Sequence, residues 1–143
     1  PARTRHGKPP PAVAAVFDAQ PPDVRARLLA LRDLILDTAA ETPGVGPIEE
    51  TLKWGEPAYL TSASGSGTTI RINGRPGPGT YALFVNCRTR LVMDIADQYP
   101  DAFAVEGNRA LVLDARAEPP VAALRHAIVL ALTYHARKKR RSR

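Results

Sequence analysis

Apolar residues between positions 24 and 39 recur at the three- and four-residue spacing of an amphipathic helix. They are Val24, Leu28, Leu31, Ile35 and Ala39. The preceding segment Gln20-Pro21-Pro22-Asp23 suits a helix start, because proline loses no hydrogen bond in the first turn and aspartate favours the helix dipole there. Pro43-Gly44 favours the helix end. The pattern predicts a long helix with one buried face, after a shorter helix over residues 13–19.

The middle of the chain changes to patterns that are typical of β-strands. Residues 58–62, 68–72 and 80–85 are predicted strands, of which 80–85 is the clearest buried one. The connecting segments 62–67 and 73–79 are rich in Ser, Gly and Pro, and they predict flexible loops. We therefore expect the three strands to pair as an antiparallel meander.

The last part of the chain adds a hairpin between two helices. Apolar residues over 91–99 have helical spacing, and residues 102–105 and 110–113 flank the turn sequence Gly107-Asn108. A final helix is predicted from Val121 to about Arg137, apolar on nearly all sides. The expected fold class is α+β: an antiparallel sheet of about five to six strands, with the N- and C-terminal helices packed on it.

The net charge of +6 is concentrated at the two ends of the chain. Residues 1–8 carry three cations and residues 137–143 carry six, whereas residues 9–136 hold 11 cations against 14 acids. We expect a loosely held basic arm over residues 1–12, one domain over 13–137 and a basic tail over 138–143. Nucleic acid is an expected partner only through Lys138–Arg143, and a frayed, solubilising tail is the simpler interpretation.

The cysteine and histidine residues suggest no catalytic or metal site. Cys87 is the only cysteine, which excludes an intramolecular disulfide and fits a reducing compartment. A semi-buried Cys87 is favoured over a reactive thiolate, because the candidate bases His126 and His135 lie on the distant last helix. These two histidines are nine residues apart and should face opposite sides of that helix, so they cannot both bind one metal ion. No apolar run approaches the ~20 residues of a membrane span. We expect a cytoplasmic monomer or homodimer.

An acidic ridge follows another side of the long helix. Asp33, Asp37 and Glu41 repeat every four residues, a spacing at which like charges repel. The ridge is either a solvated face, diluted by Arg25 and Arg32, or a site for a metal ion or a basic partner.

The most distinctive stretch is Glu49-Glu50-Thr51-Leu52-Lys53-Trp54-Gly55-Glu56-Pro57-Ala58-Tyr59, which contains the only Trp. Its glycine and proline argue against a continuous helix or strand, so we expect a rigid joint between the leading helix and the sheet. Trp54, Glu56 and Tyr59 are candidate pocket residues for an amine or a polar ring, with Glu50 and Lys53 beside them. Alternatively, Trp54 and Tyr59 fill the core, Glu56 caps a backbone group and Lys53 pairs with Glu50.

This stretch resembles the signature of the YdhG-like family, a domain of unknown function that is found in many bacteria. The resemblance covers roughly residues 13–137 and implies the α+β fold already expected. Some members are described as frataxin-like iron chaperones, whose acidic first helix is thought to bind iron. Asp33, Asp37 and Glu41 lie on the corresponding helix here. The resemblance therefore implies iron as a candidate ligand, although no cofactor is required.

The predicted function is that of a non-enzymatic binding protein, with a small ligand beside Trp54 or iron on the acidic helix. One alternative is an enzyme that uses Glu56 as an acid or base, which requires a partly desolvated carboxylate. The other is a nucleic-acid accessory protein that acts through its basic tail.

Overall fold

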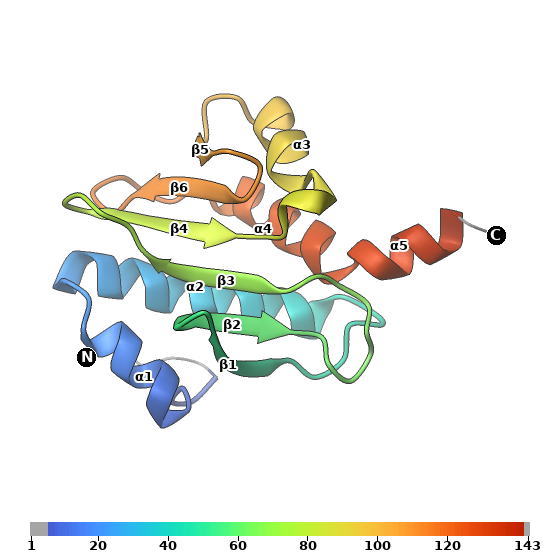
Figure 1. The fold of residues 1–143 in the computed structure, drawn as a ribbon, viewed down its shortest axis with the longest axis horizontal. Coiled ribbons are helices and arrows are strands. Elements are labelled where there is room, and N and C mark those ends of the chain that lie inside the picture. Colours follow the sequence, from blue (N-terminus) through green and yellow to red (C-terminus); the bar gives the residue numbers. More distant parts are fainter. Residues whose placement is uncertain (1–5, 142–143) are drawn as a thin grey trace.

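An antiparallel sheet lies in front of two long helices in the computed structural model, which describes residues 6–141 (Figure 1). Within this range the sheet has six strands, in the order β1-β2-β3-β4-β6-β5. The strands are β1 (Glu49–Lys53), β2 (Glu56–Leu60), β3 (Ile70–Gly74), β4 (Thr80–Phe84), β5 (Ala104–Glu106) and β6 (Ala110–Asp114). The helices are α1 (Pro11–Asp18), α2 (Pro22–Glu41), α3 (Leu91–Gln98), α4 (Val121–Leu132) and α5 (Tyr134–Arg141), with a 3-10 turn η1 (Cys87–Thr89). The predicted α+β class is confirmed.

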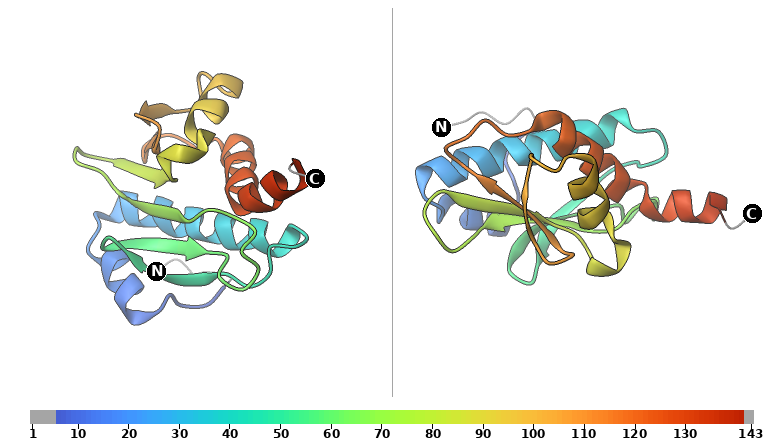
Figure 2. Two further views of the ribbon diagram at one scale, coloured as in Figure 1. Left: turned by 45° about the vertical axis from the view of Figure 1, so that its right-hand side comes forward. Right: turned by 90° about the horizontal axis from the view of Figure 1, so that it is seen from above.

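Helices α2 and α4 cover one face of the sheet and leave the other face open (Figure 2). The side chains that face these helices form the main core, to which every predicted apolar position of α2 belongs. Alternate residues point to opposite faces of a strand. Arg71 and Phe84, which are paired on β3 and β4, therefore point to the other side, which we call the open face. No described helix combines the length and the apolar character that a membrane span needs.

The stretch around Trp54 forms a β-hairpin, so the expected joint between helix and sheet was wrong. Lys53 pairs with Glu56 at the ends of β1 and β2, which leaves Trp54 and Gly55 as a two-residue turn. Their φ angles are 56° and 73°, and two positive φ values are typical of a type I′ turn. Gly55 permits this tight turn, so β1 ends at Lys53 and β2 begins at Glu56 directly after it.

The segment between β2 and β3 anchors the C-terminal helices and does not form the flexible loop that the sequence predicted. The hydroxyl of Ser66 donates to the carbonyl of Leu132 at 2.7 Å, and the Thr68 amide donates to the carbonyl of Ala131 at 2.8 Å. The carbonyl of Ser66 accepts from the Ala136 amide at 2.9 Å. These bonds replace helical ones, so the single predicted helix is divided at Thr133 into α4 and α5.

The N-terminal segment differs from the predicted loose arm. Helix α1 begins at Pro11, and the carbonyl of Gly7 already accepts a hydrogen bond of 3.0 Å from Arg32 of α2. His6 lies 2.6 Å from Asp37 on the same helix. Residues 1–5 of the predicted arm and 142–143 of the predicted tail lie outside the described range. The rest of that tail is the end of α5.

Candidate functional site

The tip of the β1–β2 hairpin presents Trp54 to solvent. Its side chain is 89% exposed, which contradicts the interpretation that Trp54 fills the core. A bulky residue in the left-handed region is strained, by about 1–3 kcal/mol, and such residues cluster at functional sites. The hairpin therefore holds an exposed aromatic ring at a backbone position that favours Asn or Gly.

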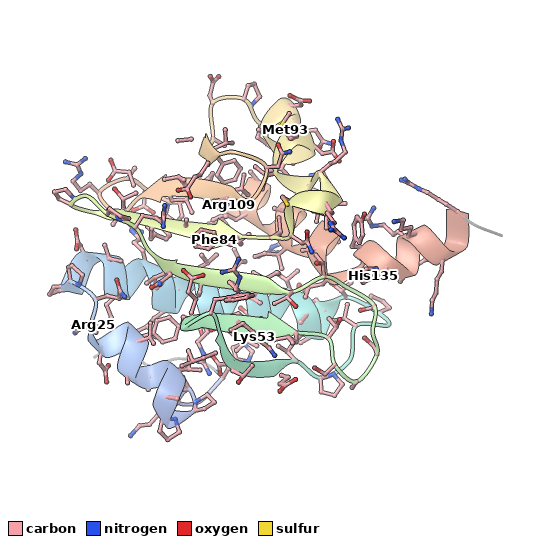
Figure 3. All side chains as sticks on the ribbon, in the orientation of Figure 1. Arg25, Lys53, Phe84, Met93, Arg109 and His135 are labelled. Carbon is pink, nitrogen blue, oxygen red and sulfur yellow. The ribbon has the colours of Figure 1, made fainter. Side chains whose placement is uncertain are left out.

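A cavity of about 430 Å³ opens beside this ring on the open face. Its charged and polar walls include Lys53, Arg71, Asn86, Cys87 and Arg109, which come from β1, β3, the segment after β4 and the β5–β6 turn. Figure 3 shows Lys53 and Arg109 on the side of the sheet that faces away from α2. Among the described residues, no Asp or Glu lines the cavity. The arrangement suits an anion that carries a flat ring.

Arg71 is held in the cavity wall by a carboxylate and an aromatic ring. It forms an ion pair with Glu56, and its guanidinium lies 5.3 Å from the centroid of the Phe84 ring. Glu56 also accepts a hydrogen bond of 3.2 Å from Asn73. Glu56, which the sequence singled out for ligand binding or as an acid or base, thus has both carboxylate oxygens bonded and positions Arg71.

Positive charge exceeds negative charge on this part of the open face. Arg75 binds Glu106 at 2.5 Å and stacks on Phe84 at 5.6 Å, while Arg109 reaches the same carboxylate at 3.4 Å. The single carboxylate of Glu106 therefore forms ion pairs with two arginines. Within the described range Lys53 is exposed and forms no hydrogen bond or ion pair through its side chain, so its charge is available to a ligand.

Two of the five predicted ligand-binding residues lie on the opposite face of the sheet. Tyr59 is buried, and its hydroxyl donates to Glu50 at 2.8 Å. Arg32 of α2 donates two hydrogen bonds to the same carboxylate, of 2.5 and 2.9 Å. Burial and the Glu50 carboxylate raise the pKa of Tyr59, and the hydrogen bond with Glu50 raises the pKa of Arg32. Glu50 and Tyr59 thus belong to a buried network, and Glu50 does not pair with Lys53.

The acidic ridge does not form a three-carboxylate group. Asp37 and Glu41 line a cavity of about 330 Å³ between α2 and α4, whereas Asp33 does not. Asp37 instead contacts His6. Within residues 6–141, no group of three or more His, Cys, Asp and Glu side chains is placed to hold a metal ion.

Cys87 is exposed in the cavity of the open face, in contrast to the predicted semi-buried position. His126 is 3.1 Å from the hydroxyl of Tyr99, and His135 packs edge-on against Tyr134. Neither histidine lines the cavity, so Cys87 has no imidazole base beside it within the described residues.

The sequence identified Trp54 and Lys53 as part of this site but missed Arg71, Asn86 and Arg109. The alternation of residues 68–72 was a usable signal, because it places Arg71 on the face opposite Ile70 and Ile72. Arg109 offered no such signal, since it reaches the cavity through the pairing of β6 with β4. Comparisons with protein-family models, with curated proteins and with solved structures gave no match for this chain.

Proposed function

We propose that the protein binds a small anionic ligand with a planar ring, of the nucleotide class, in the open-face cavity beside Trp54. The observation that carries the proposal is the conformation of Trp54. A tryptophan at φ 56° with 89% of its side chain in solvent contributes nothing to the core, although the turn would be more stable with Asn at the same position. A ligand that stacks on the ring explains why the residue is there.

The remaining walls supply the complementary charge. Base–aromatic stacking contributes roughly 1–3 kcal/mol per base, and charge-assisted hydrogen bonds from Arg and Lys to phosphate are stronger than neutral ones. Lys53 and Arg109 are the exposed cations of the cavity, and Arg71 is positioned by Glu56 and Phe84. The frataxin-like iron handling implied by the YdhG-like resemblance has no comparable support, because the described residues include no group of three or more ligand side chains on the acidic ridge or elsewhere.

Two intrinsic probes test the proposal. Trp54 is the only tryptophan and Cys87 the only cysteine, and both line the cavity. Titration with adenosine monophosphate is expected to quench Trp54 fluorescence and to slow the reaction of Cys87 with a thiol reagent, with the same saturation curve. Adenosine alone and inorganic phosphate alone should bind more weakly, because each satisfies only half of the site.

Matched variants assign the effect to the cavity. Lys53→Gln is expected to weaken adenosine monophosphate binding severalfold, whereas Arg125→Gln, which removes an exposed cation on α4, should leave it unchanged. The proposal is refuted if millimolar adenosine monophosphate changes neither the fluorescence of Trp54 nor the reactivity of Cys87.

A further inference from the structure

A second cavity with a similar composition lies on the far side of η1. It measures about 270 Å³ and is lined by Arg90 from the start of α3 and by Tyr134, Arg137, Lys138 and Arg141 of α5. It therefore combines an aromatic ring with several cations, as the open-face cavity does. Asp94 is the one carboxylate among its described lining residues.

The two cavities share one segment of the chain. Val85, Asn86 and Cys87 line the first cavity, and Thr89, Arg90 and Leu91 line the second. Arg88 lies between these two sets and is exposed, and its side chain forms no hydrogen bond or ion pair with another residue of the described range. Three residues of a 3-10 turn span about 6 Å, so the cavities are neighbours on the surface.

The β2–β3 segment fixes α5 relative to the first cavity. Thr68 lines that cavity, and its amide binds the carbonyl of Ala131. Two residues earlier, the carbonyl of Ser66 accepts from the Ala136 amide in the first turn of α5. Helix α5 extends beyond the sheet from this anchor (Figures 1 and 2), so its cations continue the basic surface outward from η1.

Helix α5 is strongly cationic, and Asp94 of α3 is the carboxylate that shares a cavity with it. Its last turns contain Lys138, Lys139, Arg140 and Arg141, and the helix has no Asp or Glu. Burial lowers the pKa of Arg137, and the nearby Arg141 and Arg140 lower it further. A polyanion at this surface would relieve that mutual repulsion.

We propose that a single-stranded nucleic acid binds along this surface, with one base on Trp54 in the open-face cavity and its backbone crossing Arg88 and Arg90 toward α5. The inference rests on the proposed function, because it makes the mononucleotide cavity the first subsite of a longer track. An aromatic ring in each cavity favours a single strand, since the faces of bases are hidden in a duplex. The cations between the rings match the spaced negative charges of a sugar-phosphate backbone.

The test compares ligands of different length on the full chain. Fluorescence anisotropy of labelled thymidine oligomers is measured from the dinucleotide to about 12 nucleotides, within the range of single-strand site sizes. Affinity should rise steeply until the track is filled and then level off. A duplex of equal length and vesicles of phosphatidylserine and phosphatidylcholine serve as alternative polyanions. Binding of either as tight as that of the single strand would overturn the proposal.

The double variant Arg88→Gln/Arg90→Asn removes the bridging charges. Asn is chosen at position 90 because Arg90 has φ 60°, a conformation that Asn adopts readily. The variant is expected to weaken oligomer binding by about tenfold or more. It should also make the salt dependence shallower, so that the negative slope of log affinity against log salt decreases in magnitude by about 1.4. The charge-matched control Lys8→Gln/Arg125→Gln, at two exposed cations outside both cavities, should change neither quantity.

The outcomes separate the two proposals. If adenosine monophosphate binds at Trp54 but affinity does not rise with oligomer length, the proposed mononucleotide site is supported and the proposed track for a single strand is wrong. The track is equally wrong if Arg88→Gln/Arg90→Asn and the control variant weaken oligomer binding to the same extent. If adenosine monophosphate does not bind while the oligomer does, with the expected loss in Arg88→Gln/Arg90→Asn, the mononucleotide function is wrong and the track stands.

Discussion

Arg32 of α2 and Glu50 of β1 form a buried ion pair, with two hydrogen bonds of 2.5 and 2.9 Å between the guanidinium and the carboxylate. Only 2% of Arg32 is exposed. Tyr59 of β2 donates to the same carboxylate, and the carbonyl of Gly7 accepts from the same guanidinium. The pair thus connects the N-terminal segment, the long helix and the first two strands, and it supports the hairpin that presents Trp54.

Removal of one partner from this network should be costly. Arg32→Met leaves the Glu50 carboxylate buried without its cation, and breaking a buried pair in this way destabilises by about 3–5 kcal/mol. The free energy of unfolding, measured with a chemical denaturant, is expected to fall by that amount. The triple variant Arg32→Met/Glu50→Leu/Tyr59→Phe should recover much of the loss, because none of the three side chains then buries an unpaired polar group and the exposed Gly7 carbonyl can bind water. Equal stability of the single and triple variants would contradict this account.

The same network predicts sensitivity to alkali. Because burial and Glu50 raise the pKa of Tyr59, the unfolded chain releases this proton near pH 10 while the folded protein retains it. The folded state then binds more protons, so this contribution to stability is complete below about pH 10 and is lost as the pH rises further, by about 1.4 kcal/mol per unit. Unfolding free energies of Tyr59→Phe should therefore fall less steeply above pH 10 than those of the parent. Tyr134→Phe, at a half-buried tyrosine outside the network, is the control, and parallel curves for parent and Tyr59→Phe would contradict the assignment.

The sequence predicted the fold well where burial follows periodicity. The apolar face of α2 and the strands β2, β3 and β4 were recognisable, since one face of each element must be covered. For Trp54 only the alternative of core filling was wrong, and the reason is physical: hydrophobicity suggests burial, but the register of a two-residue hairpin turn places the residue in solvent. Glu50 was expected beside the Trp54 pocket but lies in the buried network on the other face of the sheet. Its partner Arg32 is distant in sequence, so no local pattern indicates their contact.

Long-range contacts also explain why the prediction for the β2–β3 segment was wrong. Gly67 looked like part of a flexible loop, yet a Cβ atom on it would lie 2.5 Å from the backbone of Ala131 and Leu132. The close approach of two backbones, and not flexibility, requires glycine here. No local pattern reveals a contact between residues that are more than 60 positions apart in the chain.

This contact gives a prediction on the orientation of α5. Gly67→Ala should force the β2–β3 segment away from the end of α4 and destabilise the protein by about 1–3 kcal/mol, the usual cost of overpacking. Ala63→Ser, at an exposed position of the same segment, should have little effect. Denaturant unfolding measures both changes. If Gly67→Ala is as stable as the parent, the backbone contact does not hold α5 in place.

The Trp54–Gly55 turn predicts opposite effects on stability and on binding. Trp54→Asn replaces a strained, exposed tryptophan by the residue most favoured before glycine in a type I′ turn, so the free energy of unfolding should rise by about 1 kcal/mol. The same variant removes the stacking surface, so protection of Cys87 by adenosine monophosphate should be lost.

Gly55→Ala is the matched control for the turn itself. No atom lies within 4 Å of a Cβ placed on Gly55, so its expected loss of about 1–2 kcal/mol comes from the backbone alone at φ 73°. Thermal or denaturant unfolding of both variants, together with the thiol assay, separates the two effects. If Trp54→Asn is less stable than the parent, the ring has a structural role that its exposure does not reveal. Undiminished protection of Cys87 in Trp54→Asn would show that ligand binding does not depend on this ring.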